Sequence, residues 1–193
     1  IYDNKEDAYA QIEEYKAAVL AAGDEVYDEN ITLTPQPQVS ITVEDQETGY
    51  IVAMIGGRGT KEGSKTLNRA TDTKRQPGST FKIVAVYAPA LDSAGLTLAT
   101  MINDAPFNYA SGRPVSNWWG SEYRGLNSLR QGIIDSMNII AVKTLTMITP
   151  QLGFDYVKNF GFTTVVDRKE VTVGGESQVF SDIQQSLALG GLT

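Results

Sequence analysis

The sequence predicts an α+β fold in which a short β-hairpin near the N-terminus precedes a mostly helical region. Apolar and polar residues alternate over residues 38–55, as in strands with one buried face, whereas long apolar runs with helical spacing follow from residue 81. Of the 193 residues, 41% are hydrophobic, which is enough to bury the core of one domain of ordinary size. Two clear strands are few for a chain of this length.

Residues 5–22 predict an amphipathic helix that connects rather than catalyses. Its apolar residues recur at helical spacing among Glu and Lys, and they are Ala8, Ile12, Tyr15, Val19 and Leu20. Because the segment is acidic and carries no site chemistry, we expect it to pack on the edge of the domain. Pro35 and Pro37 then break the pattern, as a linker would. We therefore interpret residues 1–35 as a connecting helix and linker, and residues 36–193 as a separate domain.

A β-hairpin is predicted next, because the hydrophobic pattern changes to a two-residue period. Val39, Ile41 and Val43 alternate with polar residues, which is typical of a half-buried strand. Residues 45–49 end in glycine and supply the turn, and residues 50–55 form the second apolar strand. The polar and basic stretch that follows is interpreted as a surface loop.

The first candidate site comes directly after this loop. Pro77 and Gly78 punctuate the chain just before a long apolar run, which predicts a turn leading into a buried helix. Ser79 and Lys82 are three residues apart, so on a helix they share one face, with Cβ atoms about 5–6 Å apart. A hydroxyl beside an amine at the start of an apolar helix is a candidate nucleophile with its base. Taken alone, the same pattern fits a helix N-cap followed by a surface lysine.

Composition narrows the chemistry that this serine could use. The sequence contains no histidine, which excludes a Ser-His-Asp triad and a His-ligated zinc site. It contains no cysteine, which excludes disulfides, thiolate metal sites and a cysteine nucleophile. The base must then be Lys, Asp, Glu or Tyr, and burial against the apolar helix would lower the pKa of Lys82 toward neutrality. The net charge of −7 argues against a nucleic-acid partner, and we expect neither a cofactor nor a metal ion.

Beyond the buried helix, the sequence predicts irregular structure over residues 92–127. In this part, Trp118 and Trp119 fit either a plug of a long loop onto the core or the wall of a substrate groove. Residues 126–148 predict two helices that meet near Ser136. The remaining elements are predicted, in chain order, as a short helix over residues 154–160, a Val-rich stretch over residues 165–173 and a helix from about residue 182.

A second polar motif lies inside the most apolar part of the chain. Ser136 and Asn138 flank Met137, with Gly-Ile-Ile before them and Ile-Ile-Ala-Val after them. Polar side chains in such surroundings must be hydrogen-bonded, face a cleft or break the helix. They therefore indicate either part of a site or a helix–helix junction capped by Ser136.

Together, the Ser-x-x-Lys of Ser79 and Lys82 and the Ser-x-Asn of Ser136 and Asn138 resemble motifs of penicillin-binding proteins and serine β-lactamases. Further segments resemble the transpeptidase domain of class A, high-molecular-mass penicillin-binding proteins, from about residue 36 to the end. These segments are residues 68–71, 75–79, 123–125, 129–130, 136–139, 141–143, 160–162 and 188–193. The resemblance implies the α+β transpeptidase fold that penicillin-binding proteins share with serine β-lactamases.

The resemblance also implies a role for each motif residue. Ser79 would be the acylated nucleophile and Lys82 its general base. Ser136 would relay a proton to the leaving group, and Asn138 would hold the amide of a peptide or β-lactam while contacting Lys82. Met137 stands where class A β-lactamases have Asp, which favours a penicillin-binding protein.

The third motif of the family, Lys-Thr-Gly or Lys-Ser-Gly, does not occur in the sequence. Lys143 and Thr144 are followed by Leu145 on an apolar helix and cannot serve. Because the family carries this motif on a later strand of its sheet, we expect the chain to stop before that strand and the sheet to be incomplete. By the same resemblance, residues 1–35 would connect to an upstream glycosyltransferase domain that is absent from the sequence.

The implied function is that of a serine D,D-transpeptidase, which cross-links peptidoglycan through an acyl-enzyme formed on D-Ala-D-Ala stem peptides and is inhibited by β-lactams. The implied partners are stem peptides on lipid II-derived glycan strands, β-lactam antibiotics and a companion chain with the rest of the domain. The implied location is the extracytoplasmic face of a bacterial cell membrane. Two alternatives stay open: a catalytically incomplete interaction module, and a β-lactam sensor or serine β-lactamase, which would need a carboxylate placed for deacylation.

Overall fold

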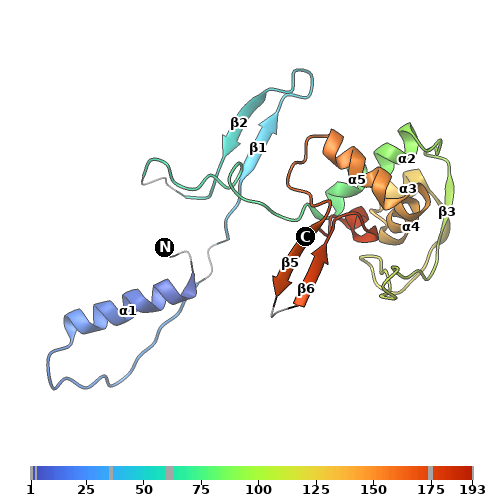
Figure 1. The fold of residues 1–193 in the computed structure, drawn as a ribbon. Coiled ribbons are helices and arrows are strands. Elements are labelled where there is room, and N and C mark those ends of the chain that lie inside the picture. The colour runs from blue at the N-terminus through green and yellow to red at the C-terminus, as the bar shows by residue number, and fades with distance from the viewer. Residues whose placement is uncertain (1, 3, 35–36, 60–62, 174–175, 193) are drawn as a thin grey trace. The chain divides into compact units, whose positions relative to one another are not determined.

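The computed structural model describes residues 2, 4–34, 37–59, 63–173 and 176–192. The chain forms two compact units, Ile1–Thr73 and Lys74–Thr193 (Figure 1). The boundary predicted between residues 35 and 36 lies inside the first unit, and its interpretation as the start of a separate domain stays a prediction.

Helix α1 (Lys5–Val19) opens the first unit and confirms the predicted helix. The Asn4 side chain accepts a hydrogen bond from the Asp7 backbone N–H at 2.7 Å, which satisfies one of the free N–H groups of the first turn. Only Ala8 of this helix is buried, and Tyr15 on its apolar face is 69% exposed. Within its own unit the helix therefore rests on local interactions, and its packing on a domain edge stays a prediction.

Strands β1 (Ile41–Glu44) and β2 (Ile51–Ile55) form the predicted antiparallel hairpin. In its turn, the Asp45 carboxylate accepts hydrogen bonds from Glu47 N at 3.0 Å and Thr48 Oγ1 at 2.9 Å. These bonds stabilise the ionised form and hold the pKa of Asp45 below its ordinary value. Every residue of both strands is exposed, so the expectation of a half-buried sheet face is wrong for the described part of this unit.

Four helices of the second unit pack around one apolar core (Figure 1), and they are α2 (Ala88–Asp92), α3 (Leu129–Ile134), α4 (Asn138–Ile148) and α5 (Pro150–Asn159). Most residues of α4 are buried, as its apolar sequence predicts. The two helices expected to meet near Ser136 are confirmed as α3 and α4. Helix α5 starts earlier than predicted, because Thr149 caps it by accepting a hydrogen bond from Leu152 N at 3.3 Å and Pro150 suits the first position of a helix.

The second unit also contains two hairpin-like sheets that the sequence patterns did not reveal. Strand β3 (Met101–Asp104) pairs antiparallel with β4 (Gly125–Ser128), and β5 (Lys169–Val173) pairs with β6 (Glu176–Phe180). Strands of four residues are too short to stand out as alternation within residues 92–127. In the described part of the chain every sheet has two strands, in agreement with the small and incomplete sheet structure that was expected.

The last predicted helix is shorter and tighter than expected. A 3₁₀ segment spans Gln185–Leu189 and ends at Gly190, whose φ of +66° lies in the left-handed region that favours glycine. Asp182, where the helix was expected to begin, lies before this segment and is buried. Its Oδ2 accepts a hydrogen bond from Val166 N at 2.7 Å, so it joins two loops instead of starting a helix.

The helix of the first candidate site contains one π-helical turn over Ile83–Tyr87, in which Ala88 N donates to Ile83 O five residues earlier. Pro89 explains why the α-helical pattern is interrupted here. Proline has no N–H, so the Ala85 carbonyl cannot receive the usual bond from the residue four positions later. Helix α2 then continues the element toward the core.

Tyr87 ends this π turn, and its hydroxyl is buried without a hydrogen-bond partner among the described residues. Leaving a buried polar group unpaired costs about 1–3 kcal/mol. Tyr87→Phe is therefore expected to leave the free energy of unfolding unchanged or to raise it by about 1 kcal/mol, as measured by urea unfolding. Tyr156→Phe is the matched control, because its hydroxyl bonds to Asp92 and its removal should destabilise. A larger loss for the Tyr87 variant than for this control would contradict the assignment.

Candidate active site

Ser79 lies in a 3₁₀ turn over Gly78–Thr80, at the start of the predicted helix. Gly78 has a φ of +61°, and Thr80 Oγ1 donates to Pro77 O at 2.7 Å, so the chain turns sharply before the helix begins. The Ser79 residue is exposed, which leaves its hydroxyl open to a ligand. Within the described part of the chain, no hydrogen bond to Ser79 Oγ is present.

The glycine segment near the end of the chain packs directly on this turn. A Cβ at Gly190 would lie 2.5 Å from Gly78 N and 2.8 Å from Gly78 Cα, so only glycine fits at this contact. Gln76 Nε2 also donates to Leu192 O at 2.9 Å. The segment that follows the last 3₁₀ turn therefore supports the backbone that carries Ser79.

Lys82 is the buried cation of the site, with only 2% of the residue exposed. Its ammonium donates three hydrogen bonds, to Ser136 O at 2.7 Å, to Ser136 Oγ at 3.0 Å and to Asn138 Oδ1 at 2.6 Å. All three acceptors are neutral, and no carboxylate pairs with Lys82 among the described residues. Burial without a counter-ion disfavours the charged form and lowers the pKa of Lys82 from 10.5 to about 8.

Ser136 lies in the short connection between α3 and α4 with a φ of +49°, a left-handed conformation that is uncommon for a residue with a Cβ. Met137 holds this connection, because its side chain is fully buried and its N–H donates to Gly132 O at 2.9 Å. The predicted helix junction is confirmed, but the suggested capping role of Ser136 is wrong. Met137 precedes α4, and Ser136 Oγ accepts its hydrogen bond from Lys82.

Asn138 is the first residue of α4, and its side-chain amide joins two segments. Its Oδ1 accepts from Lys82, and its Nδ2 donates to Ser116 O at 2.8 Å. Three of the four predicted site residues are thus in direct hydrogen-bond contact. Ser79 lies one helical turn before Lys82 without a hydrogen bond to it, and contacts of this kind commonly tighten only when a substrate binds.

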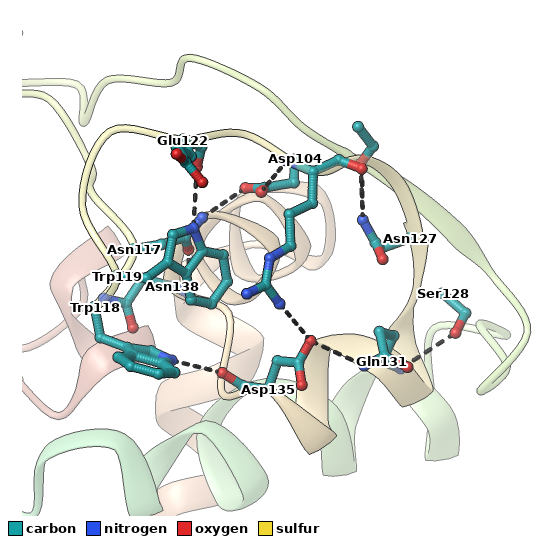
Figure 2. A network of polar contacts seen from close by, with 12 residues as sticks. Asp104, Asn117, Trp118, Trp119, Glu122, Asn127, Ser128, Gln131, Asp135 and Asn138 are labelled. Atoms are coloured by element: carbon teal, nitrogen blue, oxygen red, sulfur yellow. Dashed lines mark hydrogen bonds and ion pairs between the residues drawn. The ribbon is translucent and has the colours of Figure 1, made fainter.

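Two further residues at this site escaped the sequence analysis, namely Asn117 and Asp104 (Figure 2). Asn117 Oδ1 accepts from the backbone N–H groups of Asn138 at 2.9 Å and Ile139 at 3.2 Å. Asn117 Nδ2 donates to Asp104 Oδ1 at 2.8 Å. Both side chains are buried, although they belong to a segment that the sequence predicted as irregular, where no periodic pattern signals burial.

The two tryptophans lie on the same loop as Asn117 (Figure 2). Trp118 is 71% exposed, and its Nε1 donates to Asp135 O at 2.9 Å. The Arg124 guanidinium lies 3.8 Å from the centre of the Trp119 ring and pairs with the Asp135 carboxylate at 2.7 Å. Trp119 is partly buried against the core, as a plug would be, whereas Trp118 is not.

Other kinds of site are less evident in this chain. A surface pocket lined by Tyr109, Arg113, Ile183 and Ser186, among others, includes none of the four predicted site residues. Across the described ranges, no group of three acidic side chains could hold a metal ion. No helix of that same part has the length and apolar composition needed to cross a bilayer. Hydrogen bonds around a buried lysine therefore define the candidate site.

An α+β chain without histidine, in which a buried lysine follows a serine-bearing turn and contacts a Ser-x-Asn junction, has the motif pattern shared by penicillin-binding proteins and serine β-lactamases. Residues 39–192 match the family described as "Penicillin binding protein transpeptidase domain". The chain belongs to this penicillin-binding protein transpeptidase family, which confirms the resemblance found in its motifs.

Curated relatives agree with this family. Penicillin-binding protein 1A of Clostridium tetani is 36% identical over 136 residues, which cover 66% of this chain and 17% of the relative. Penicillin-binding protein 1A of Neisseria lactamica is 39% identical over 133 residues, which cover 66% of this chain and 16% of the relative. The chain thus spans about a sixth of the length of these relatives.

Solved structures confirm the predicted fold. Penicillin-binding protein 1A of Haemophilus influenzae matches 80% of this chain with a TM-score of 0.59 and 27% identity, over 20% of its own chain. The penicillin-binding protein PonA1 of Mycobacterium tuberculosis matches 80% of this chain and 39% of its own, with a TM-score of 0.56. Because the identity to PonA1 is 18%, that match speaks for the fold alone.

Proposed function

We propose that this chain carries the acylation residues of a peptidoglycan transpeptidase, with Ser79 as the nucleophile and Lys82 as the general base. The observation that supports this most is the environment of Lys82, which is buried, held by neutral oxygens of Ser136 and Asn138, and unpaired by any described carboxylate. A lysine with a pKa of about 8 is neutral often enough near that pH to accept a proton. Ser79 lies one helical turn before Lys82, and the residue is exposed, so its hydroxyl is open to a substrate.

In the proposed first step, Lys82 Nζ takes the hydroxyl proton of Ser79 while Ser79 Oγ attacks the carbonyl carbon of the penultimate D-Ala of a stem peptide. The Oγ–C bond forms, and the amide bond to the terminal D-Ala breaks. Ser136 Oγ gives its proton to the departing amine and regains one from Lys82 across their 3.0 Å contact. The acyl-enzyme is left with Lys82 neutral again.

In the proposed second step, the amine of a neighbouring stem peptide, or water, attacks the ester. Lys82 takes the proton of the attacking group, the ester C–Oγ bond breaks, and Ser79 Oγ regains a proton from Lys82. Asn138 orients the acyl donor in both steps. Its Nδ2 has a second hydrogen besides the one donated to Ser116 O, and this hydrogen suits an amide carbonyl of a peptide or of a β-lactam.

The wider assignments rest on family membership and extend this proposal. We propose that β-lactams acylate Ser79, that the protein acts on the extracytoplasmic face of a bacterial cell membrane, and that stem peptides of glycan strands are its partners. Residues 1–35 would then connect to a glycosyltransferase domain, and residues 36–193 would form the N-terminal part of the transpeptidase domain. None of the relatives' names points to a companion chain, so that expectation has no support.

Covalent labelling tests the nucleophile. The intact protein is expected to gain the mass of one penicillin when incubated with it, and Ser79→Ala is expected to gain none, because the substitution removes the proposed nucleophile and the other hydroxyl beside Lys82, that of Ser136, serves as the proton relay. Intact-mass measurement reads the result, and peptide mapping locates the adduct. Ser111→Ala is the matched control, since Ser111 is an exposed loop serine. Labelling of the Ser79 variant at the wild-type rate would sink the assignment.

The same measurement separates the remaining alternatives. A wild-type protein that never labels would favour a non-catalytic interaction module. A label that disappears within seconds would favour a serine β-lactamase, which needs a carboxylate to activate water for deacylation. Since none of the described hydrogen bonds brings a carboxylate to Lys82 or Ser136, and none reaches Ser79 Oγ, we expect a persistent acyl-enzyme.

A further inference from the structure

We infer that Asp104 and Asn117 are positioning residues, which hold the start of helix α4 and thereby fix Asn138 and Ser136 against Lys82. This inference rests on the proposed role of Lys82. Neither residue belongs to a motif that the sequence singled out. They come from the end of strand β3 and from the loop that follows it, and Figure 2 shows them joined by a hydrogen bond.

The buried carboxylate is the first step of the argument. Asp104 is 0% exposed, and in the described part of the chain no Lys or Arg side chain pairs with it. Its two oxygens accept instead from neutral groups, Asn117 Nδ2 at 2.8 Å and Arg124 N at 2.9 Å. A buried charge without a counter-ion is costly, so the fold retains this carboxylate for its ability to accept two hydrogen bonds at once.

The orientation of the Asn117 amide follows from this carboxylate. A carboxylate only accepts hydrogen bonds, so the end of Asn117 that faces Asp104 must be its NH₂ group. The carbonyl oxygen is then directed at the first two N–H groups of α4, those of Asn138 and Ile139, at 2.9 and 3.2 Å. Helix starts have free N–H groups, and here a side chain from another segment satisfies two of them.

The start of α4 in turn determines the surroundings of Lys82. Asn138 Oδ1 accepts from Lys82 at 2.6 Å, and the residues just before it contribute Ser136 O and Ser136 Oγ at 2.7 and 3.0 Å. A continuous chain of hydrogen bonds therefore runs from Asp104 through Asn117 and Asn138 to Lys82. The left-handed φ of Ser136 needs such support, because that conformation is unfavourable by itself.

Two single substitutions and their combination test this chain of bonds. Asp104→Asn leaves one of its two N–H partners facing a donor, and Asn117→Asp places two acceptors against each other. In the double variant, Asn at 104 can donate to Asp at 117 and accept from Arg124 N, while Asp at 117 still accepts from the start of α4. The double variant thus restores every pairing with the donor and acceptor exchanged.

Two readouts in the intact protein distinguish positioning from simple stabilisation. Each single variant is expected to lower the acylation rate at saturating penicillin roughly tenfold to hundredfold, with little change in apparent affinity. A loosened junction admits water to the Lys82 ammonium, so the titration midpoint of its amine, followed by NMR with labelled lysine, should rise from about 8 toward 10.5. The double variant should recover both values. Asn103→Asp, on the exposed side of β3, is the control and should change neither.

Single variants that stay folded and keep the wild-type rate and midpoint would overturn the inference, and so would a folded double variant that recovers neither. If the single variants do not fold, the double variant alone decides, because only it should fold and acylate. If the wild type never acylates but the midpoint shifts and recovers as described, the proposed function fails while the positioning role stands.

Discussion

Lys82→Met is expected to lower the rate of acylation by labelled penicillin by a factor of about 10²–10⁴, the usual contribution of a general base. The thioether is close in length to the lysine side chain and cannot accept the serine proton. It also leaves Ser136 Oγ and Asn138 Oδ1 without the hydrogen bonds that they receive from Lys82. Single-turnover labelling of the intact protein measures the rate.

The pH dependence identifies the base more sharply than the rate does. The neutral amine is the competent form, so the wild-type rate should rise with pH through a midpoint of about 8 and level off above it. At an ordinary lysine pKa of 10.5 the same rise would lie far above neutrality. Lys82→Met should lose this rise of the acylation rate with pH. The control Lys158→Met changes an exposed lysine at the end of α5 and should keep the rise. An unchanged rise in Lys82→Met would rule Lys82 out as the base.

Gly190→Ala is expected to lower the free energy of unfolding by about 2–5 kcal/mol and to slow acylation as well. About 1–2 kcal/mol comes from the left-handed φ, and about 1–3 kcal/mol from forcing a methyl group into a filled space. That methyl group would lie 2.5 Å from Gly78 N, in the turn that carries Ser79, and backbone atoms cannot move aside as a flexible side chain can. Urea unfolding and penicillin labelling measure the two effects.

A second glycine separates conformational strain from the clash. Gly95 has a φ of +69°, close to the +66° of Gly190, but a Cβ there meets no atom within 4 Å. Gly95→Ala should therefore show only the strain of about 1–2 kcal/mol and leave acylation unchanged. Equal losses in the two variants would mean that the contact between Gly190 and Gly78 has no energetic effect.

The helical core and the four predicted site residues were predictable because each depends on local sequence. The apolar run of α4 predicts a buried helix wherever it is placed, and polar residues inside that run must be satisfied. That requirement singled out Ser136 and Asn138, and the structure satisfies both through Lys82. The spacing of Ser79 and Lys82 similarly needs only one helical turn.

The support of the site was not predictable from the same kind of reasoning. Asp104 and Asn117 meet because β3 pairs with β4 and the loop between them folds back, and four-residue strands give no clear periodicity. For the hairpin of β1 and β2, the local pattern was sufficient to predict the strands but not their burial. Its alternation correctly predicts strands, but burial depends on tertiary neighbours, and alternation alone does not report whether they are present.

The π-helical turn over Ile83–Tyr87 has a consequence for insertions and deletions. An α-helix rotates by about 100° per residue, and a π turn accommodates one extra residue in the same element. Without that extra residue, the apolar side chains of α2 would be out of phase with Lys82, and only one of the two could face the interior. A single deletion between Lys82 and Pro89 is therefore expected to rotate the amine away from Ser136 and Asn138.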